Sequence, residues 1–245
     1  MGTGVRSATA FAGISVFATT IATVFLYFAP TGPPSLQNVL TRSLIGLITF
    51  GSLIIFTTGL NELINGDEAS AHFALSVAQT AAVLFIGIGF IALSNEAGVA
   101  FGAPGGSMDP TTDGPLAAAN ILSHGSIKRL LTAIYLISTS YAVRRSDLFP
   151  RWVGALGYAI AAVNIVFIPA LFFGTNVTHF YSAHGWGNSA LAGSLIIWWV
   201  FAVSVVLLRS TRDTGRTSTE RAGAIPTEGA RTSSASRSRI TLSKS

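Results

Sequence analysis

Four polar side chains in one segment have the types and spacing to bind an anion. Asn120, His124 and Lys128 are each separated by four positions, and Arg129 follows directly. Residues four apart lie on one face of an α-helix, so a helix here would carry a polar stripe that ends in two cations. We predict that these four residues bind a small anionic or amphiphilic ligand. The alternative is that both cations extend to the membrane surface and the other two side chains are simply hydrated.

Three histidines could instead hold a metal ion. His124, His179 and His184, with Glu96 or Asp109 as the acid, match the three nitrogens and carboxylate of some catalytic zinc sites. The spacing gives little support, because two of the histidines are five residues apart among glycines and no H-E-x-x-H pattern is present. We therefore predict no cofactor, and keep a zinc-dependent lipid hydrolase as the alternative.

Two more polar residues are secondary candidates. Glu62 lies near the end of an apolar stretch, where it could pair with a cation or carry a proton. A carboxylate that is simply hydrated at the membrane surface is the alternative. Asn164 is the one strongly polar side chain deep in the fifth apolar stretch, where it could hydrogen-bond between helices. Together with Pro169, it could also shape a cavity.

Long apolar stretches must position these residues. Only 10% of the chain is charged, whereas a soluble domain carries about a quarter, and a helix needs about 20 mostly apolar residues to cross a bilayer. The sequence therefore predicts an all-α membrane protein, a bundle of six transmembrane helices within residues 1–208. The predicted spans are 9–29, 40–64, 73–93, 115–143, 153–173 and 190–208.

The fourth span differs from the others. Its uncharged part, 130–143, is too short to cross a bilayer by itself. Pro115 favours a helix start upstream, and a continuous helix over 115–143 would place Lys128 and Arg129 about one turn inside the hydrocarbon. Charges at that depth face a bundle interior, pair with a partner or extend to the surface.

Basic residues set the orientation. Cytoplasmic loops are enriched in Lys and Arg, and a cytoplasmic N-terminus places eight of them inside and three outside. The eight are Arg6, Arg144, Arg145, Arg151, Arg209, Arg212, Arg216 and Arg221; the three are Arg42, Lys128 and Arg129. We predict a multi-pass protein of the cell membrane with both termini in the cytoplasm.

The basic C-terminal segment accounts for most of the net positive charge. Residues 209–245 contain few large apolar side chains and no periodic pattern, so we predict a disordered tail. Such a tail is attracted to anionic lipids and does not indicate nucleic-acid binding. Expected partners are therefore the lipid bilayer and its anionic lipids. Glycines in the spans could also support contacts with a membrane protein partner or a second copy.

One motif resembles a known family. The stretch DLFPRWVGALG at 147–157, with the closing span at 199–209, is similar to bacterial six-helix integral membrane proteins of a domain family of unknown function. The resemblance implies fold and location, and it brings no catalytic residues. Phosphate-binding loops, dinucleotide fingerprints and nucleophile elbows are absent from the sequence. We expect a non-catalytic binding or transport-associated role, with the hydrolase or a structural partner subunit as alternatives.

Overall fold

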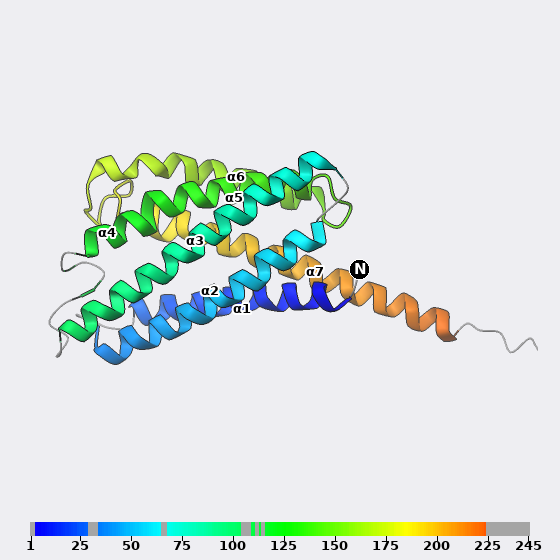
Figure 1. Ribbon diagram of the computed structural model, residues 1–245, viewed down its shortest axis with the longest axis horizontal. Helices are drawn as coiled ribbons and strands as arrows, with labels where there is room; N and C mark the ends of the chain where they lie inside the picture. The colour runs from blue at the N-terminus through cyan, green and yellow to red at the C-terminus, as the bar shows by residue number, and fades with distance from the viewer. Residues whose placement is uncertain are drawn as a thin grey trace, which may run out of the picture. The chain divides into compact units, whose positions relative to one another are not determined.

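The computed structural model describes residues 3–28, 34–64, 68–103, 109–110, 113 and 116–223. Within these residues the chain is helical, without a strand (Figure 1). The α-helices are α1 (Thr3–Phe28), α2 (Leu36–Ile64), α3 (Ala69–Gly102), α4 (Ala117–Leu122), α5 (Lys128–Val143), α6 (Arg151–Phe167) and α7 (Gly193–Gly223). Three short turns join them: the π-helical η1 (Ser123–Ile127) and η3 (Gly187–Ala192), and the 3₁₀-helical η2 (Ile168–Phe173).

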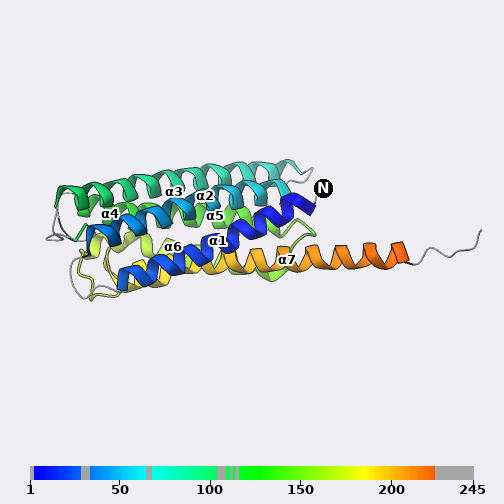
Figure 2. The ribbon, with the colours of Figure 1, turned by 90° about the horizontal axis from the view of Figure 1, so that it is seen from below.

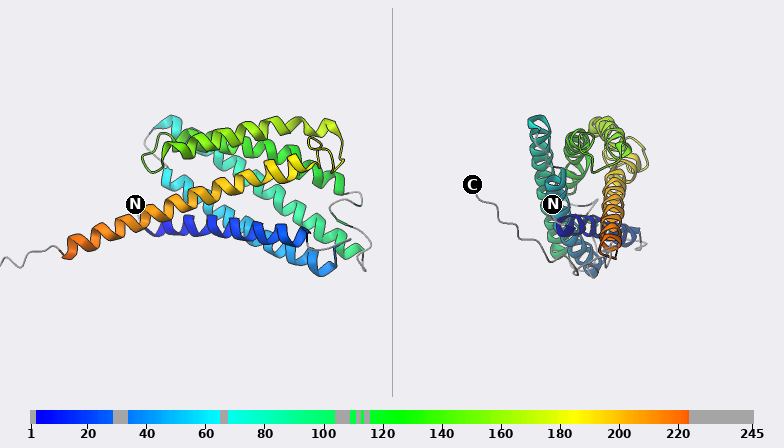
Figure 3. Two further views of the ribbon diagram at one scale, coloured as in Figure 1. Left: turned by 180° about the vertical axis from the view of Figure 1, so that it is seen from behind. Right: turned by 90° about the vertical axis from the view of Figure 1, so that its right-hand side faces the viewer.

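Consecutive helices pack side by side. Helix α1 packs on α2, α2 on α3, α3 on α5 and α5 on α6. The bundle part of α7 lies against α6, where the Trp199 indole donates to the Val153 carbonyl at 3.1 Å, and against α1, where Phe17 stacks on Phe201. Figures 2 and 3 show these helices running along a common direction.

Five helices are long and apolar enough to cross a membrane. They are Gly4–Phe28, Leu36–Ile64, Ala69–Gly102, Arg151–Phe173 and Gly187–Ser210. Only 17% to 39% of the residues in their most apolar windows are buried in the bundle. Large apolar side chains such as Phe28 and Phe172 are more than 80% exposed. An apolar exterior of this kind fits a multi-pass membrane protein, because exposed apolar side chains are stable against the hydrocarbon chains of lipids and unfavourable in water.

The two ends of the bundle hold different contacts. At one end the Arg6 guanidinium donates to Ser210 Oγ at 2.8 Å, and Arg145 pairs with Glu68; we call this the Arg6 end. At the other end Tyr27 donates to Glu96; we call this the Glu96 end. The Lys128 ammonium lies over the rings of Phe50 and Phe85, midway along α2 and α3, and Asn120 lies nearer the Glu96 end, beside Asn95.

Helix α3 is longer than predicted. The sequence prediction ended the third span at residue 93 and placed a polar outer segment at 94–114, but the helix continues to Gly102. The polar side chains that suggested a loop are satisfied inside the bundle, since Asn95 bonds to Asn120 and Glu96 to Tyr27. Residues 104–108, 111–112 and 114–115 lie outside the described residues, as does the turn at 65–67.

The fourth span is broken, so the prediction of one continuous helix over 115–143 is wrong at Gly125. Its backbone leaves the helical region (φ −81°, ψ −113°) between α4 and α5. A Cβ at this position would lie 3.2 Å from Asn188 Nδ2 and 3.4 Å from the Ala183 carbonyl oxygen. Glycine therefore lets the loop before α7 approach the break closely. The Ser126 hydroxyl donates to the Ile168 carbonyl at 2.8 Å and ties the break to η2.

The last two predicted spans correspond to the apolar helices Arg151–Phe173 and Gly187–Ser210, although each combines an α-helix with a short turn of another helical type. Helix α6 ends at Phe167 and continues as the 3₁₀ turn η2, because Pro169 cannot donate the hydrogen bond that would extend an α-helix. Helix α7 runs to Gly223, so residues 209–223 are helical rather than disordered. No proline interrupts this helix, since the first proline after Gly193 is Pro226. Among the described residues, those up to 211 form one compact unit, and those from 212 to 223 belong to a second. The remainder of the predicted tail, 224–245, lies outside the described residues.

Candidate functional site

Arg129 is the centre of the candidate site. Its side chain is buried at the start of α5, with 6% of the residue exposed. Its Nε donates to Asn188 Oδ1 at 3.0 Å, Nη1 to Asn164 Oδ1 at 3.2 Å, and Nη2 to the His124 carbonyl at 3.5 Å. All three acceptors are neutral. Among the described residues no carboxylate lies within 4.0 Å of this guanidinium, so its charge is not balanced by an ion pair.

Three separate parts of the chain hold the guanidinium in place. The Asn164 amide is fixed within α6 by donating to the Ile160 carbonyl at 2.9 Å. The Asn188 amide is fixed in η3 by donating to the Ala183 carbonyl at 2.8 Å. Both amides therefore turn their oxygens toward Arg129. Gly193 leaves room at the start of α7, since a Cβ there would lie 3.1 Å from Arg129 Nη2.

Lys128 is the second buried cation. It is 5% exposed, and its Nζ lies 3.2 Å from His124 Nδ1. The ammonium also lies over the rings of Phe50 and Phe85, at 5.2 and 5.1 Å from their centroids. Cation–π contacts of this kind stabilise a desolvated cation without neutralising it. Because Lys128 and Arg129 are both buried in the bundle, the alternative in which they extend to the membrane surface is wrong.

Asn120 completes the predicted stripe one turn before His124. Its Oδ1 accepts a hydrogen bond from Asn95 Nδ2 of α3 at 3.0 Å, while its own Nδ2 is buried without a protein partner among the described residues. The structure therefore places the four residues of the predicted anion site along one helical column, α4 to α5, and leaves a hydrogen-bond donor available on it.

A second charged cluster at the Glu96 end was missed by the sequence analysis. Tyr27 donates to Glu96 Oε2 at 3.1 Å, and the Arg42 guanidinium stacks over the Tyr27 ring at 3.9 Å from its centroid. Arg42 and Glu96 are 3% and 4% exposed. The sequence analysis had counted Arg42 only toward orientation and Glu96 only as a candidate metal ligand, and it did not place the two together.

The buried charges at this end are unbalanced. Among the described residues, the charged side chains that are buried comprise three cations and one anion: Arg42, Lys128, Arg129 and Glu96. Glu96 bonds to Tyr27 and forms no ion pair within 4.0 Å. The buried charged groups therefore include more cations than anions, and the half-buried Asp109 is a second carboxylate near Glu96.

The predicted metal ligands are not brought together. Among the described residues, which include His124, His179, His184 and Glu96, no group of three or more side chains could hold a metal ion. His124 turns its Nδ1 toward the Lys128 ammonium, and His179 is exposed in the 174–188 loop. The geometry gives no support to the zinc alternative.

The remaining candidates lie in different environments. Asn164 joins the site through its bond to Arg129. Glu62 is exposed near the Arg6 end and takes no part in the site. His184 is half-buried in the loop before η3, where burial lowers the pKa of its imidazole below the usual value and the Asp109 carboxylate opposes that shift. The 174–188 loop is held by ring contacts, including Phe167 with Phe180 at 5.7 Å between centroids.

Comparison of the chain with protein-family models, with curated proteins and with solved structures gave no match. The resemblance to bacterial six-helix membrane proteins stays a prediction.

Proposed function

We propose that this chain is a six-span protein of the cell membrane that binds a small anionic or amphiphilic ligand at the buried cationic site. The role we propose is binding, or help in moving the ligand, without catalysis. The site consists of Asn120, His124, Lys128 and Arg129, with Asn164 and Asn188 holding Arg129. The partners we propose are the lipid bilayer and its anionic lipids.

The fourth span follows from its length and its place in the bundle. Residues 117–143 form a broken helical column, which at 1.5 Å per residue is about 40 Å long. A column of that length is sufficient to cross a bilayer whose hydrocarbon is about 30 Å thick. Its two charges lie inside the bundle, where charged groups of membrane-spanning helices are normally found.

The orientation follows from the charges at each end. The Arg6 end carries Arg6 and the exposed arginines of the 144–151 turn, and Ser210 lies beside Arg6. Basic residues in short loops favour the cytoplasmic side. The Arg6 end is therefore proposed to face the cytoplasm, and the cationic site to lie in the outer half of the membrane.

One observation carries the binding proposal: Arg129 is buried and hydrogen-bonded only to neutral oxygens. A buried charge without a partner costs several kcal/mol even after relaxation, and its neutral hydrogen bonds recover only part of that cost. An anion close to Arg129 and Lys128 would gain charge-assisted hydrogen bonds and reduce the excess positive charge. An amphiphilic anion could in addition place its apolar part against the exposed apolar exterior of the helices.

A thermal-stability measurement on the purified protein tests this proposal. The probes are inorganic phosphate, dihexanoyl phosphatidic acid and, as the uncharged control, dihexanoyl phosphatidylcholine, each titrated in detergent. A ligand at about 100 times its Kd stabilises the folded state by about 2.7 kcal/mol. We expect phosphate or the phosphatidic acid to raise the unfolding temperature of the wild-type chain, and phosphatidylcholine to leave it unchanged.

Matched substitutions distinguish the site from general charge. Arg129→Gln should abolish the shift, whereas Arg151→Gln, which removes an exposed arginine at the Arg6 end, should keep it. Stabilisation by phosphate alone would indicate a free anion, and stabilisation by phosphatidic acid alone would indicate a lipid headgroup. An equal shift in both variants, or no shift with either anion in the wild-type protein, would rule the site out.

A further inference from the structure

The polar face of the fourth column continues beyond Lys128. Thr132, Tyr135 and Thr139 follow at intervals of four, three and four residues, so they lie along one face of α5. They are 1%, 6% and 2% exposed. None of the three hydroxyl oxygens has a hydrogen-bond partner of good geometry among the described residues, although the Thr139 hydroxyl lies near that of Tyr135. We call these three residues the hydroxyl seam.

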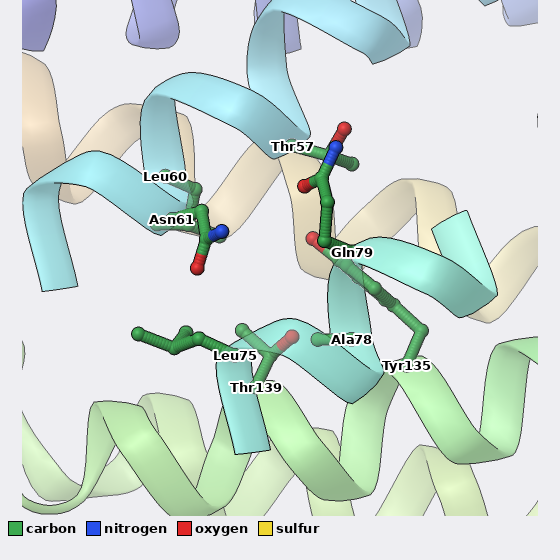
Figure 4. Close-up of a pocket in the computed structure, with 8 residues that line it drawn as sticks. All are labelled: Thr57, Leu60, Asn61, Leu75, Ala78, Gln79, Tyr135 and Thr139. Carbon is green, nitrogen blue, oxygen red and sulfur yellow. The ribbon is translucent and has the colours of Figure 1, made fainter. Parts of the chain in front are cut away.

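Two residues of the seam border a small cavity between α2, α3 and α5 (Figure 4). In Figure 4 the Tyr135 side chain extends from α5 toward Gln79 of α3. The space open to the centre of a water molecule is about 10 Å³, which is close to the least that one water needs. The polar residues of its lining are Thr57, Asn61, Gln79, Tyr135 and Thr139.

The cavity has the polar partners that a buried water requires. Asn61 Oδ1 is buried without a hydrogen-bond partner among the described residues, and the neighbouring hydroxyls of Tyr135 and Thr139 have only each other nearby, without good hydrogen-bond geometry. Thr57 donates its hydroxyl proton to the Leu53 carbonyl at 2.9 Å, which leaves its lone pairs available as acceptors. A buried water typically makes two to four hydrogen bonds, and a buried polar atom left unsatisfied is destabilising.

We propose that the hydroxyl seam and its cavity form an internal water-binding site between α2, α3 and α5. The site stands on its own contacts and does not depend on the anion proposal. Water bound here satisfies groups of α2 and α5 at once, and Gln79 of α3 lines the same space, so the water holds these helices together through hydrogen bonds. Because Thr132 lies one helical turn from Lys128, the seam also extends the polar region of the anion site toward the Arg6 end of the bundle.

Hydroxyl-radical footprinting of the purified protein in nanodiscs tests this proposal. Radicals generated from bound water oxidise the side chains that touch it, and mass spectrometry measures the rate at each residue. Trp199 is the internal control: it is 0% exposed and packs against Tyr135 with 6.1 Å between ring centroids, but its indole nitrogen bonds to a protein carbonyl. Indole is at least as reactive as phenol toward this radical.

We expect Tyr135 to be oxidised about tenfold faster than Trp199, because only Tyr135 touches a hydrated space. Equal protection of the two rings would overturn the proposal. Thr139→Val should reduce the Tyr135 rate toward that of Trp199, while Thr80→Val, which removes an exposed hydroxyl of α3, should not change it. Continued protection of Trp199 in each variant shows that the bundle is folded. An unchanged Tyr135 rate in Thr139→Val would also contradict the site.

Discussion

The Arg129 side chain links α5 to α6 and η3 through hydrogen bonds to the neutral side chains of Asn164 and Asn188. A hydrogen bond to a charged group contributes about 1.5–3 kcal/mol to stability. Asn188→Ala should therefore lower the free energy of unfolding by about that amount, because it leaves the buried guanidinium with one acceptor fewer. In an Arg129→Met background the same substitution should cost much less. A double-mutant cycle by thermal unfolding measures this coupling, and additive effects would contradict the link.

His184 predicts a dependence of stability on pH. Burial lowers the pKa of this imidazole below the usual value of about 6.5, so the unfolded chain binds a proton more readily than the folded one. The contribution of His184 to stability is thus complete above pH 6.5 and is lost as the pH falls toward the folded-state pKa. The unfolding temperature of His184→Gln should decrease less than that of the wild type between pH 7.5 and 5.5. Identical slopes would refute this assignment.

Local spacing predicted only part of the candidate site. The four-residue interval between His124 and Lys128 predicted that their side chains meet, and they do, although the π-helical turn η1 with its break at Gly125 lies between them. The side-chain acceptors of Arg129 lie 35 and 59 residues away in the sequence. Asn164 was noticed as the polar residue deep in an apolar span, whereas Asn188 stood in a polar loop where nothing distinguished it.

At the scale of the helices, glycines set how closely the bundle packs. A Cβ on Gly157 of α6 would lie 2.0 Å from Ser140 Oγ of α5 and 3.2 Å from the Trp199 indole nitrogen. Overpacking of this kind typically costs about 1–3 kcal/mol, so Gly157→Ala should lower the unfolding temperature. Gly87 of α3 has no atom within 4 Å of the corresponding position. Gly87→Ala should leave stability unchanged or raise it by up to about 1 kcal/mol; equal losses in both variants would show that the contact is not tight.

The sequence located the helices but not all their ends. The length of an apolar stretch determines whether that segment can cross the lipid bilayer as a helix. Five stretches were long enough to be identified by this criterion. The end of a helix depends also on contacts that form only in the folded bundle. Glu96 was placed in a loop because it is charged, yet Tyr27 satisfies it inside the bundle and the helix continues. The break at Gly125 similarly depends on a loop that arrives from 183–188.

At the scale of the whole molecule, the distribution of charge separates the two ends of the bundle. The charged groups at the Arg6 end are mostly exposed, and the pair of Arg145 with Glu68 is one of them. Hydrogen bonds from Ser70 and the nearby Arg145 lower the pKa of the Glu68 carboxyl. The charged groups nearest the Glu96 end include three buried cations and the buried carboxylate of Glu96, with the half-buried Asp109 nearby. For the ligand proposed above, the direction in which the protein is inserted decides which compartment supplies it.

Cysteine labelling tests that direction, and the chain is suited to it because it contains no cysteine. Val177 is 51% exposed in the loop before η3, and Asp147 is exposed in the turn between α5 and α6. These two positions lie on opposite sides of the span formed by α6 and η2. A membrane-impermeant maleimide added to intact cells should label Val177→Cys at once and Asp147→Cys only after permeabilisation.

The reverse pattern would place the cationic site toward the cytoplasm, and immediate labelling of both in sealed cells would contradict a membrane-spanning α6. With the expected pattern, the ligand would have to come from the outer compartment or the outer leaflet, since the buried cations lie in the half of the bundle that this loop covers.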